Sequence, residues 1–397
     1  MKTFDGIIAL GGVDWWYHNR GHYDLRLLRA LAPEIPVLYV NSVGVRVPRL
    51  GQGGRFAQRV LRKLSSLRQG LVEVEPGFHV ASLAYLPSSG ARALWAGALA
   101  CQVRLAARHL GLRRPLLWAA NPTAAELMGR IGEVATLHQR TDRFEAFEEG
   151  DAARLEGQVQ RLLEESELSV YCARGLMAED APRVRSAAFV EHGVDIDVFE
   201  RAGRLAVEEQ QVLRDVPRPR VGFVGGLDRH TFDLELFRSV ARRAQDLHFV
   251  LVGGSTLPEE AFELDNITRV ERQPVEAVPG YMAACDVLMM PWNQSPWIDG
   301  CNPIKLKEYL AVGRPIVSTP FRELERYTGL VRTATTASAF EDQLRRALSG
   351  PHDPAPGRDR VRGATWSDQA RRVLVALAGQ GLHPECVTPQ EVQPCLA

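Results

Sequence analysis

The residues with the clearest chemical potential lie in the stretch 300–319, where a loop, a helix and a strand are expected in succession. Asn302 is a good N-cap, and Pro303 suits the first position of a helix. The free amides of a helix start, with Lys305 in the first turn, favour an anion such as a phosphate. Glu308, one turn further on, can accept hydrogen bonds from a sugar hydroxyl. The alternative is that Lys305 and Glu308 are an ordinary surface pair on one helix face.

The elements that must position this stretch follow from its own pattern and from two glycine pairs. Gly313 suits a left-handed helix end, and the β-branched run after it predicts a buried strand. Earlier in this half, strand-like segments end in Gly225-Gly226 and in Gly253-Gly254. Glycines directly after strands allow close approach of the backbone to a bound nucleotide. Neither pair forms the Gly-x-Gly-x-x-Gly motif, so a dinucleotide dehydrogenase is poorly supported.

The first half opens with a strand, a loop, a helix and a second strand, which is the start of an open parallel α/β sheet. Ligands of such sheets bind beyond the carboxyl ends of the strands. The first loop lies at that edge and is rich in polar and aromatic side chains, so we expect it to bind a ligand. Its candidate residues are Trp15, His18, Arg20 and His22. The alternative is that Trp15 and its neighbour Trp16 cover the end of the sheet.

Asp142 follows a strand-like segment, 135–138, in the loop that begins at Gln139. A catalytic carboxylate would be well placed there, although a lone aspartate in a loop is more often a turn or cap residue.

Residues 43–71 contain arginines and lysine but no acidic residue. Apolar residues recur at helical spacing from Phe56 onward, so the segment is a candidate for binding an anionic membrane. The basic residues expected to face that membrane are Arg55, Arg59, Arg62 and Lys63. The alternative is a solvated helix that packs its leucines on the sheet.

The composition is that of an ordinary globular protein. Of 397 residues, 45% are hydrophobic. The 48 Lys and Arg balance the 48 Asp and Glu, so the chain has no net positive charge that would indicate binding to nucleic acid. The six cysteines lack metal-ligand spacing, so we expect reduced thiols in a cytoplasm. The N-terminus has no signal-peptide core, and no apolar run approaches the length of a membrane span.

Three motifs carry a resemblance to a known family. Pro303-x-Lys305-x-x-Glu308-Tyr-Leu-Ala-x-Gly313-x-Pro315 closely resembles the nucleotide-sugar signature of bacterial GT-B glycosyltransferases of the family 4 type. The segment 190–199 resembles the Asn-Gly-Val-Asp-x-x-x-Phe segment of that class, with His192 in place of Asn, between the domains. The segment 281–291 is similar to a strand of the same class. The first half resembles enzymes of exopolysaccharide and teichuronic acid assembly, including the xanthan-type glucuronosyltransferase.

The resemblance implies an α/β protein of the GT-B fold, with two Rossmann-like domains that face each other across a deep cleft. A C-terminal helix would cross back to the N-terminal domain. The expected divisions are an acceptor domain, a linker, a nucleotide-sugar domain, the crossing helix and a flexible tail, at 1–200, 201–219, 220–363, 364–380 and 381–397.

The implied reaction is transfer of a sugar from a UDP- or GDP-sugar to a hydroxyl of a saccharide or lipid-linked acceptor, without a metal and without a cofactor other than the nucleotide sugar itself as co-substrate. Lys305 would hold the diphosphate, Glu308 the ribose hydroxyls, and the loop residues 15–22 would line the acceptor side. Asp142 would take the proton of the attacking hydroxyl. Such an enzyme would be cytoplasmic and peripheral at the inner face of the plasma membrane.

Two departures from the family pattern keep alternatives open. Position 300 is glycine where family 4 enzymes usually carry a glutamate. The turn after the first strand of the second domain has Arg229 displaced and lacks the usual lysine. A GT-B-like sugar-nucleotide epimerase and a catalytically degenerate binding or scaffold subunit therefore remain as alternatives.

Overall fold

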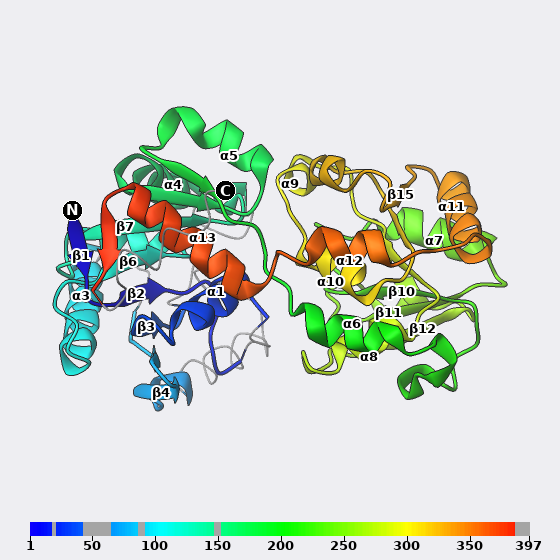
Figure 1. Cartoon of the computed structure of the whole chain (residues 1–397), viewed down its shortest axis with the longest axis horizontal. Coiled ribbons are helices and arrows are strands. Elements are labelled where there is room, and N and C mark those ends of the chain that lie inside the picture. Colours follow the sequence, from blue (N-terminus) through cyan, green and yellow to red (C-terminus); the bar gives the residue numbers. More distant parts are fainter. Residues whose placement is uncertain (18–20, 43–64, 86–91, 147–151, 386–397) are drawn as a thin grey trace. The chain divides into compact units, whose positions relative to one another are not determined.

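The computed structural model describes residues 1–17, 21–42, 65–85, 92–146 and 152–385. The chain forms two compact units (Figure 1). Met1–Glu191 and Trp366–Ala397 make up the first unit, and His192–Thr365 makes up the second. The expected division at residue 200 thus differs from the structure, in which residues 192–200 pack with the second unit. No helix in the described part of the chain is long and apolar enough to cross a membrane.

The first unit is built on an eight-stranded sheet with the order β4-β5-β3-β2-β6-β7-β8-β9. All of its neighbouring strands are parallel except β4 and β5. The strands are β2 (Ile7–Leu10), β3 (Val37–Val40), β4 (Leu71–Glu75), β5 (Phe78–Ala81), β6 (Leu116–Ala119), β7 (Ala135–Arg140), β8 (Leu168–Tyr171) and β9 (Ala187–Phe189). The central strands are wholly buried and almost purely apolar, as expected for a parallel sheet covered on both faces.

The order of these strands defines where a ligand can enter. From β2 the chain proceeds to β3 on one side, and from β6 it proceeds to β7 on the other. The crevice between β2 and β6, beyond their carboxyl ends, is therefore the topological switch point of the sheet, where ligands of open α/β sheets bind.

Helices of the first unit include the C-terminal one. They are α1 (Tyr23–Leu31), α3 (Arg92–His109), η2 (Pro122–Glu126), η3 (Phe144–Ala146), α4 (Ala152–Glu165), α5 (Arg174–Asp180), η4 (Ala181–Arg183) and α13 (Trp366–Gly379). Figure 1 shows α13 beside α1, and the Trp366 ring lies 6.0 Å from that of Tyr23. The prediction that the C-terminal helix returns to the N-terminal domain is confirmed.

The expectation that the chain frays from residue 381 is wrong at its start. Leu382–Pro384 form the strand β16, which pairs in parallel with β1 (Lys2–Phe4). The main-chain hydrogen bonds of this ladder hold residues 2–4 and 382–384 together, which composition alone does not indicate. Residues 386–397 of the predicted tail lie outside the described residues.

The second unit has a six-stranded parallel sheet with the order β12-β11-β10-β13-β14-β15. Its strands are β10 (Arg220–Val224), β11 (His248–Val252), β12 (Ile267–Val270), β13 (Val287–Met290), β14 (Ile316–Ser318) and β15 (Arg332–Thr333). Its helices are α6 (Ile196–Arg204), η5 (Val207–Glu209), η6 (Gln211–Leu213), α7 (Leu234–Arg243), η7 (Glu259–Phe262), α8 (Val278–Ala283), α9 (Pro296–Asp299), α10 (Ile304–Val312), η8 (Arg322–Tyr327), α11 (Ala337–Ser349) and α12 (Ala355–Val361). Here the switch point lies between β10 and β13.

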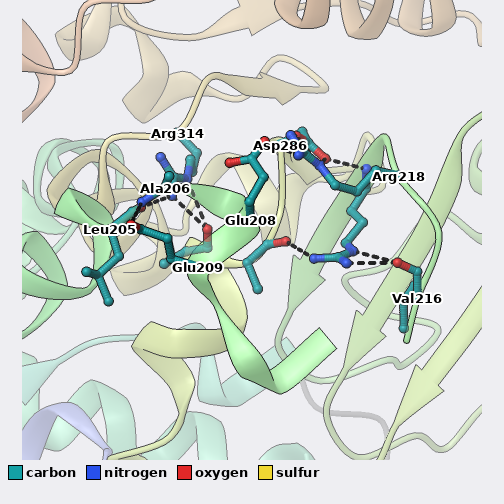
Figure 2. Close-up of polar contacts among 11 residues, drawn as sticks. Leu205, Ala206, Glu208, Glu209, Val216, Arg218, Asp286 and Arg314 are labelled. Atoms are coloured by element: carbon teal, nitrogen blue, oxygen red, sulfur yellow. Dashed lines mark hydrogen bonds and ion pairs between the residues drawn. The ribbon is translucent and has the colours of Figure 1, made fainter. Parts of the chain in front are cut away.

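The segment predicted as an interdomain linker, 201–219, is instead fixed to the second unit (Figure 2). Arg218 forms ion pairs with Glu208 and with Asp286, which precedes β13. The Arg314 guanidinium donates to the carbonyl oxygen of Leu205 over 2.9 Å. The charged residues of this segment form ion pairs with the second unit, so the predicted linker is instead a part of that unit.

Candidate functional site

The helix α10 begins one residue later than predicted. Pro303, expected at the first helical position, takes the N-cap position, and Asn302, expected as the cap, lies before it and is buried. The other end agrees with the prediction, since Gly313 closes the helix in the left-handed conformation with φ 78°. Leu306 and Leu310 are buried as expected.

Lys305 lies at the switch point of the second sheet, in a cage of aromatic rings. Its Nζ atom is 5.0 Å from the centre of the Phe223 ring on β10 and 5.2 Å from that of Trp292, which follows β13. Burial lowers the pKa of Lys305, and the carboxylates of Glu308 and Asp228 oppose that shift. The result is a cation held by ring faces and drawn partly out of water, where its attraction for an anion is strengthened.

The two glycine turns lie against this lysine. A Cβ atom on Gly225 would stand 2.5 Å from the Lys305 Nζ, and one on Gly253 would overlap the carbonyl oxygen of Gly225. Gly253 also has φ 145°, a conformation that side chains rarely adopt. Gly226 is exposed beyond them. The lack of side chains here lets Lys305 approach the turn.

Two other residues predicted to bind the donor, Glu308 and Arg229, are less buried than the aromatic residues that surround Lys305. Glu308 is half-buried in the next turn of α10 and acts electrostatically on Lys305. Arg229 is exposed on the turn after Gly226, and its main-chain oxygen accepts a hydrogen bond from Asn293. Arg229, which is displaced from the position of the family's arginine in the sequence, is therefore also exposed in the structure.

Two residues of α10 have roles that the sequence did not indicate. The buried Tyr309 hydroxyl accepts a hydrogen bond from the main-chain N–H of Val224, which attaches the helix to the end of β10. Lys307 is buried, and its Nζ donates over 2.5 Å to the carbonyl oxygen of His192. His192, predicted between the domains, is thereby tied to the candidate donor helix.

The first unit places His22 in a buried polar network. Its Nδ1 lies 2.6 Å from Oδ1 of Asp24, which is fully buried. The main-chain N–H of Gly12 and the Tyr39 hydroxyl donate to the other carboxylate oxygen over 2.7 and 3.0 Å. Burial disfavours the His22 imidazolium, but the Asp24 carboxylate outweighs that effect and raises the pKa of His22. The imidazole is therefore oriented by a fixed carboxylate.

Asp142 lies near this network. Burial raises the pKa of Asp142, and the positive charges of His22 and Arg140 oppose that shift. Asp142 is half-buried in the loop after β7, next to the switch point of the first sheet. A carboxylate near a histidine, at the edge where ligands enter, has the chemistry of a general base.

Trp15 does not line this edge, contrary to the prediction. Its side chain is 2% exposed and its ring lies 5.4 Å from that of Phe78. Its main-chain N–H donates to Asn41. The alternative, that this tryptophan covers the end of the sheet, is the correct one, because a ring of that size gains more by burial than by facing solvent. His18 and Arg20 lie outside the described residues.

The family model of group 1 glycosyl transferases matches residues 218–350. The matched residues all lie in the second unit. A curated relative, TuaH of Bacillus subtilis, whose name proposes a glycosyltransferase of teichuronic acid biosynthesis, is 30% identical over 135 residues. The match spans 33% of this chain and 33% of that relative.

Solved structures extend the similarity to both units. Sucrose-phosphate synthase from Thermosynechococcus elongatus has a TM-score of 0.67 at 17% identity and covers 93% of this chain and 97% of its own. HepE of Anabaena in complex with UDP has a TM-score of 0.63 at 13% identity, with 96% and 100% covered. Trehalose 6-phosphate synthase of Burkholderia multivorans has a TM-score of 0.64 at 14% identity, with 96% and 97% covered. The predicted GT-B fold is confirmed.

Proposed function

We propose that this chain is a glycosyltransferase that moves a sugar from a UDP- or GDP-sugar to a hydroxyl of an acceptor. The observation that carries the proposal is the ammonium of Lys305, caged by Phe223 and Trp292 and set against the Gly225 turn at the switch point. The HepE structures with UDP and with UDP-glucose support a uridine nucleotide as one donor class.

The leaving nucleoside diphosphate needs preorganised positive charge, and we assign this role to Lys305 and the first amides of α10. Arg229 is exposed on its turn and contributes less. In this proposal no metal is required, because the lysine and the helix start supply the charge that stabilises the departing phosphate.

The acceptor side is assigned to the first unit. Asp142 takes the proton of the attacking hydroxyl, and His22, held by Asp24, lies near enough to influence its charge. An acceptor that is a lipid-linked saccharide or another precursor of a cell-envelope polysaccharide is supported by the name of the B. subtilis relative.

Calorimetric titration with UDP and GDP tests the donor site. Lys305→Met is expected to weaken the binding of whichever nucleotide binds by about tenfold or more, since a charge-assisted phosphate contact is lost. Lys2→Met is the matched control, because Lys2 lies in β1 of the first unit. Equal affinity of Lys305→Met and wild type would exclude the assignment of Lys305.

Binding at an anionic membrane is part of the proposal for a cytoplasmic enzyme acting at the inner face of the plasma membrane. The residues assigned to it, Arg55, Arg59, Arg62 and Lys63, lie outside the described residues. Flotation with liposomes of phosphatidylglycerol tests it: changing Arg59, Arg62 and Lys63 to Glu is expected to abolish flotation, and unchanged flotation would refute it.

The second candidate function is that of a catalytically degenerate binding or scaffold subunit. Gly300 favours it, because the resemblance implies a glutamate at this position. Gly300 ends α9 with φ −86°, which any residue adopts, so the backbone does not require a glycine there. A protein that binds UDP or GDP yet turns over no nucleotide sugar would have this function.

A further inference from the structure

Arg140, the last residue of β7, has a completely buried guanidinium that joins α5 to the loop after β7. Its Nε donates to Asp180 at the end of α5 over 3.1 Å. Its Nη1 and Nη2 donate to the two carboxylate oxygens of Glu145 over 2.8 and 2.6 Å. Nη1 also donates to the carbonyl oxygen of Asp142 over 2.8 Å. The fork of one side chain thus closes the loop that carries Asp142.

This arrangement exceeds what stability alone requires. A buried ion pair is expensive to desolvate, and apolar residues of similar volume often replace such pairs without loss. Asp180 is 1% exposed and accepts a second guanidinium, that of Arg183, so the far side of the cluster is itself fixed. A charged cluster with such defined geometry is suited to setting the position of a main-chain segment.

The position that it sets is that of Asp142. Five donor groups in one plane leave Arg140 little rotational freedom once Asp180 and Glu145 are bound. The hydrogen bond to the Asp142 carbonyl then fixes the peptide from which that side chain projects. The positive charge of Arg140 also helps to keep the pKa of Asp142 from rising further after burial has raised it.

We propose that Arg140, clamped between Glu145 and Asp180, is the positioning residue for Asp142 in the transfer reaction. This inference rests on the proposed function, in which Asp142 is the general base. Loosening the clamp should therefore slow the chemical step and leave nucleotide binding in the second unit unchanged, because misplacing a reacting group by about 1 Å costs about 100-fold in rate.

The test uses Glu145→Ala. This variant removes the two hydrogen bonds between Glu145 and the guanidinium, while the pair of Arg140 with Asp180 remains. Turnover is followed as UDP or GDP released from UDP-glucose, UDP-galactose or GDP-mannose, whichever the wild type uses. We expect kcat to fall about 10–100-fold, with the KM for the donor and the calorimetric affinity for the nucleotide within twofold of wild type. Glu145→Gln, which keeps one acceptor oxygen, should recover part of the loss.

The matched control is Arg143→Gln, which breaks the ion pair between the same loop and Glu179 of α5 and removes none of the hydrogen bonds of Arg140. It should keep a kcat within about twofold of wild type. A Glu145→Ala variant with wild-type kcat, or an equal loss in Arg143→Gln, would overturn the clamp. If Glu145→Ala does not fold, the kcat values of Glu145→Gln and Arg140→Lys are measured instead. A loss of kcat in these variants would support the clamp, and a wild-type kcat would overturn it.

Asp142→Asn in the same assay separates the two levels of the proposal. If Asp142→Asn loses turnover but Glu145→Ala does not, the clamp fails and the proposed function stands. If Asp142→Asn retains full turnover, Asp142 is not the base, and the positioning role fails with that assignment.

Discussion

The ammonium nitrogen of Lys305 lies 5.0 Å from the centre of the Phe223 ring. Lys305 belongs to the start of α10 and Phe223 to β10, so the contact joins the candidate donor helix to one of the two strands that flank the switch point. Burial at this place lowers the pKa of Lys305. The charge that the donor site offers a diphosphate is therefore expected to depend on pH below the ordinary range of a lysine.

The first prediction follows from that shift. Protonated Lys305 attracts the diphosphate, and the proton is lost as the pH rises through the lowered pKa, so affinity for UDP should already fall in the range below the ordinary lysine pKa of about 10.4. The phosphate groups are already ionised in this range. Calorimetry across this range measures it. Lys305→Met is the control that isolates any titration of the nucleotide base, and its affinity should lack the additional fall. Parallel curves for the two proteins would contradict the prediction.

The second prediction separates the two glycines of the site. In Gly225→Ala the new methyl group meets the end of the Lys305 side chain, which can move, so we expect about tenfold weaker UDP binding with little change in Tm. In Gly253→Ala the methyl group meets the main chain of Gly225 at a positive φ, so the fold itself should lose about 1–3 kcal/mol. Calorimetry and thermal unfolding of both variants distinguish the cases, and a reversed order of Tm losses would be inconsistent with the structure.

The third prediction concerns the pair of His22 and Asp24. The folded pKa of His22 is raised, so its contribution to stability is complete below about pH 6.5 and is lost as the pH rises through the raised value. Asp24 has a lowered pKa: burial alone would raise it, but His22 and the main-chain donors prevail. Its contribution is complete above about pH 3.8 and is lost as the pH falls further.

The pair therefore contributes most between about pH 4 and 6.5. Asp24→Asn should destabilise the fold in this window by about 1–3 kcal/mol, since a buried charged acceptor is lost, and by less at pH 9. Urea unfolding of wild type and variant at pH 5.5 and 9 measures the difference. A loss of the same size at both pH values would show that the charge of the pair does not stabilise the fold.

The sequence predicted α10 well because its signals are local. The apolar spacing of Leu306 and Leu310 and the left-handed Gly313 each act within one turn. It did not predict the role of Lys307 or the pairing of Arg140 with Asp180, because both depend on partners far away in the chain. Lys307 bonds to His192, which is 115 residues away in the chain. Nothing in the local pattern distinguishes such a lysine from a solvated one.

Two of the wrong predictions have a similar cause. The position of Trp15 in a polar and aromatic loop at the sheet edge predicts a ligand-binding role, but Phe78, on a strand much later in the chain, covers its ring. The segment 201–219 has the composition of a linker, but its charges find partners such as Asp286 on the sheet. Position at a sheet edge could be predicted, whereas the partner that buries a side chain could not.

The fourth prediction tests that correction. Arg218 joins Glu208 to Asp286, so Asp286→Asn should weaken the attachment of 205–218 and expose it to local opening. Cleavage by a glutamate-specific protease after Glu208 or Glu209 should become several-fold faster. Asp246→Asn, which breaks an exposed ion pair with Arg345 elsewhere in the second unit, is the matched control. Equal cleavage rates in wild type and Asp286→Asn would restore the view of a free linker.

The most direct test of the account is turnover of nucleotide sugars, measured as release of UDP or GDP with an acceptor supplied as a bacterial lipid extract. The account predicts turnover by the wild type and a loss of about 100-fold or more in Asp142→Asn, with nucleotide affinity unchanged, because a general base is removed and the donor site is intact. A wild type that binds UDP or GDP but releases neither from any nucleotide sugar would contradict it.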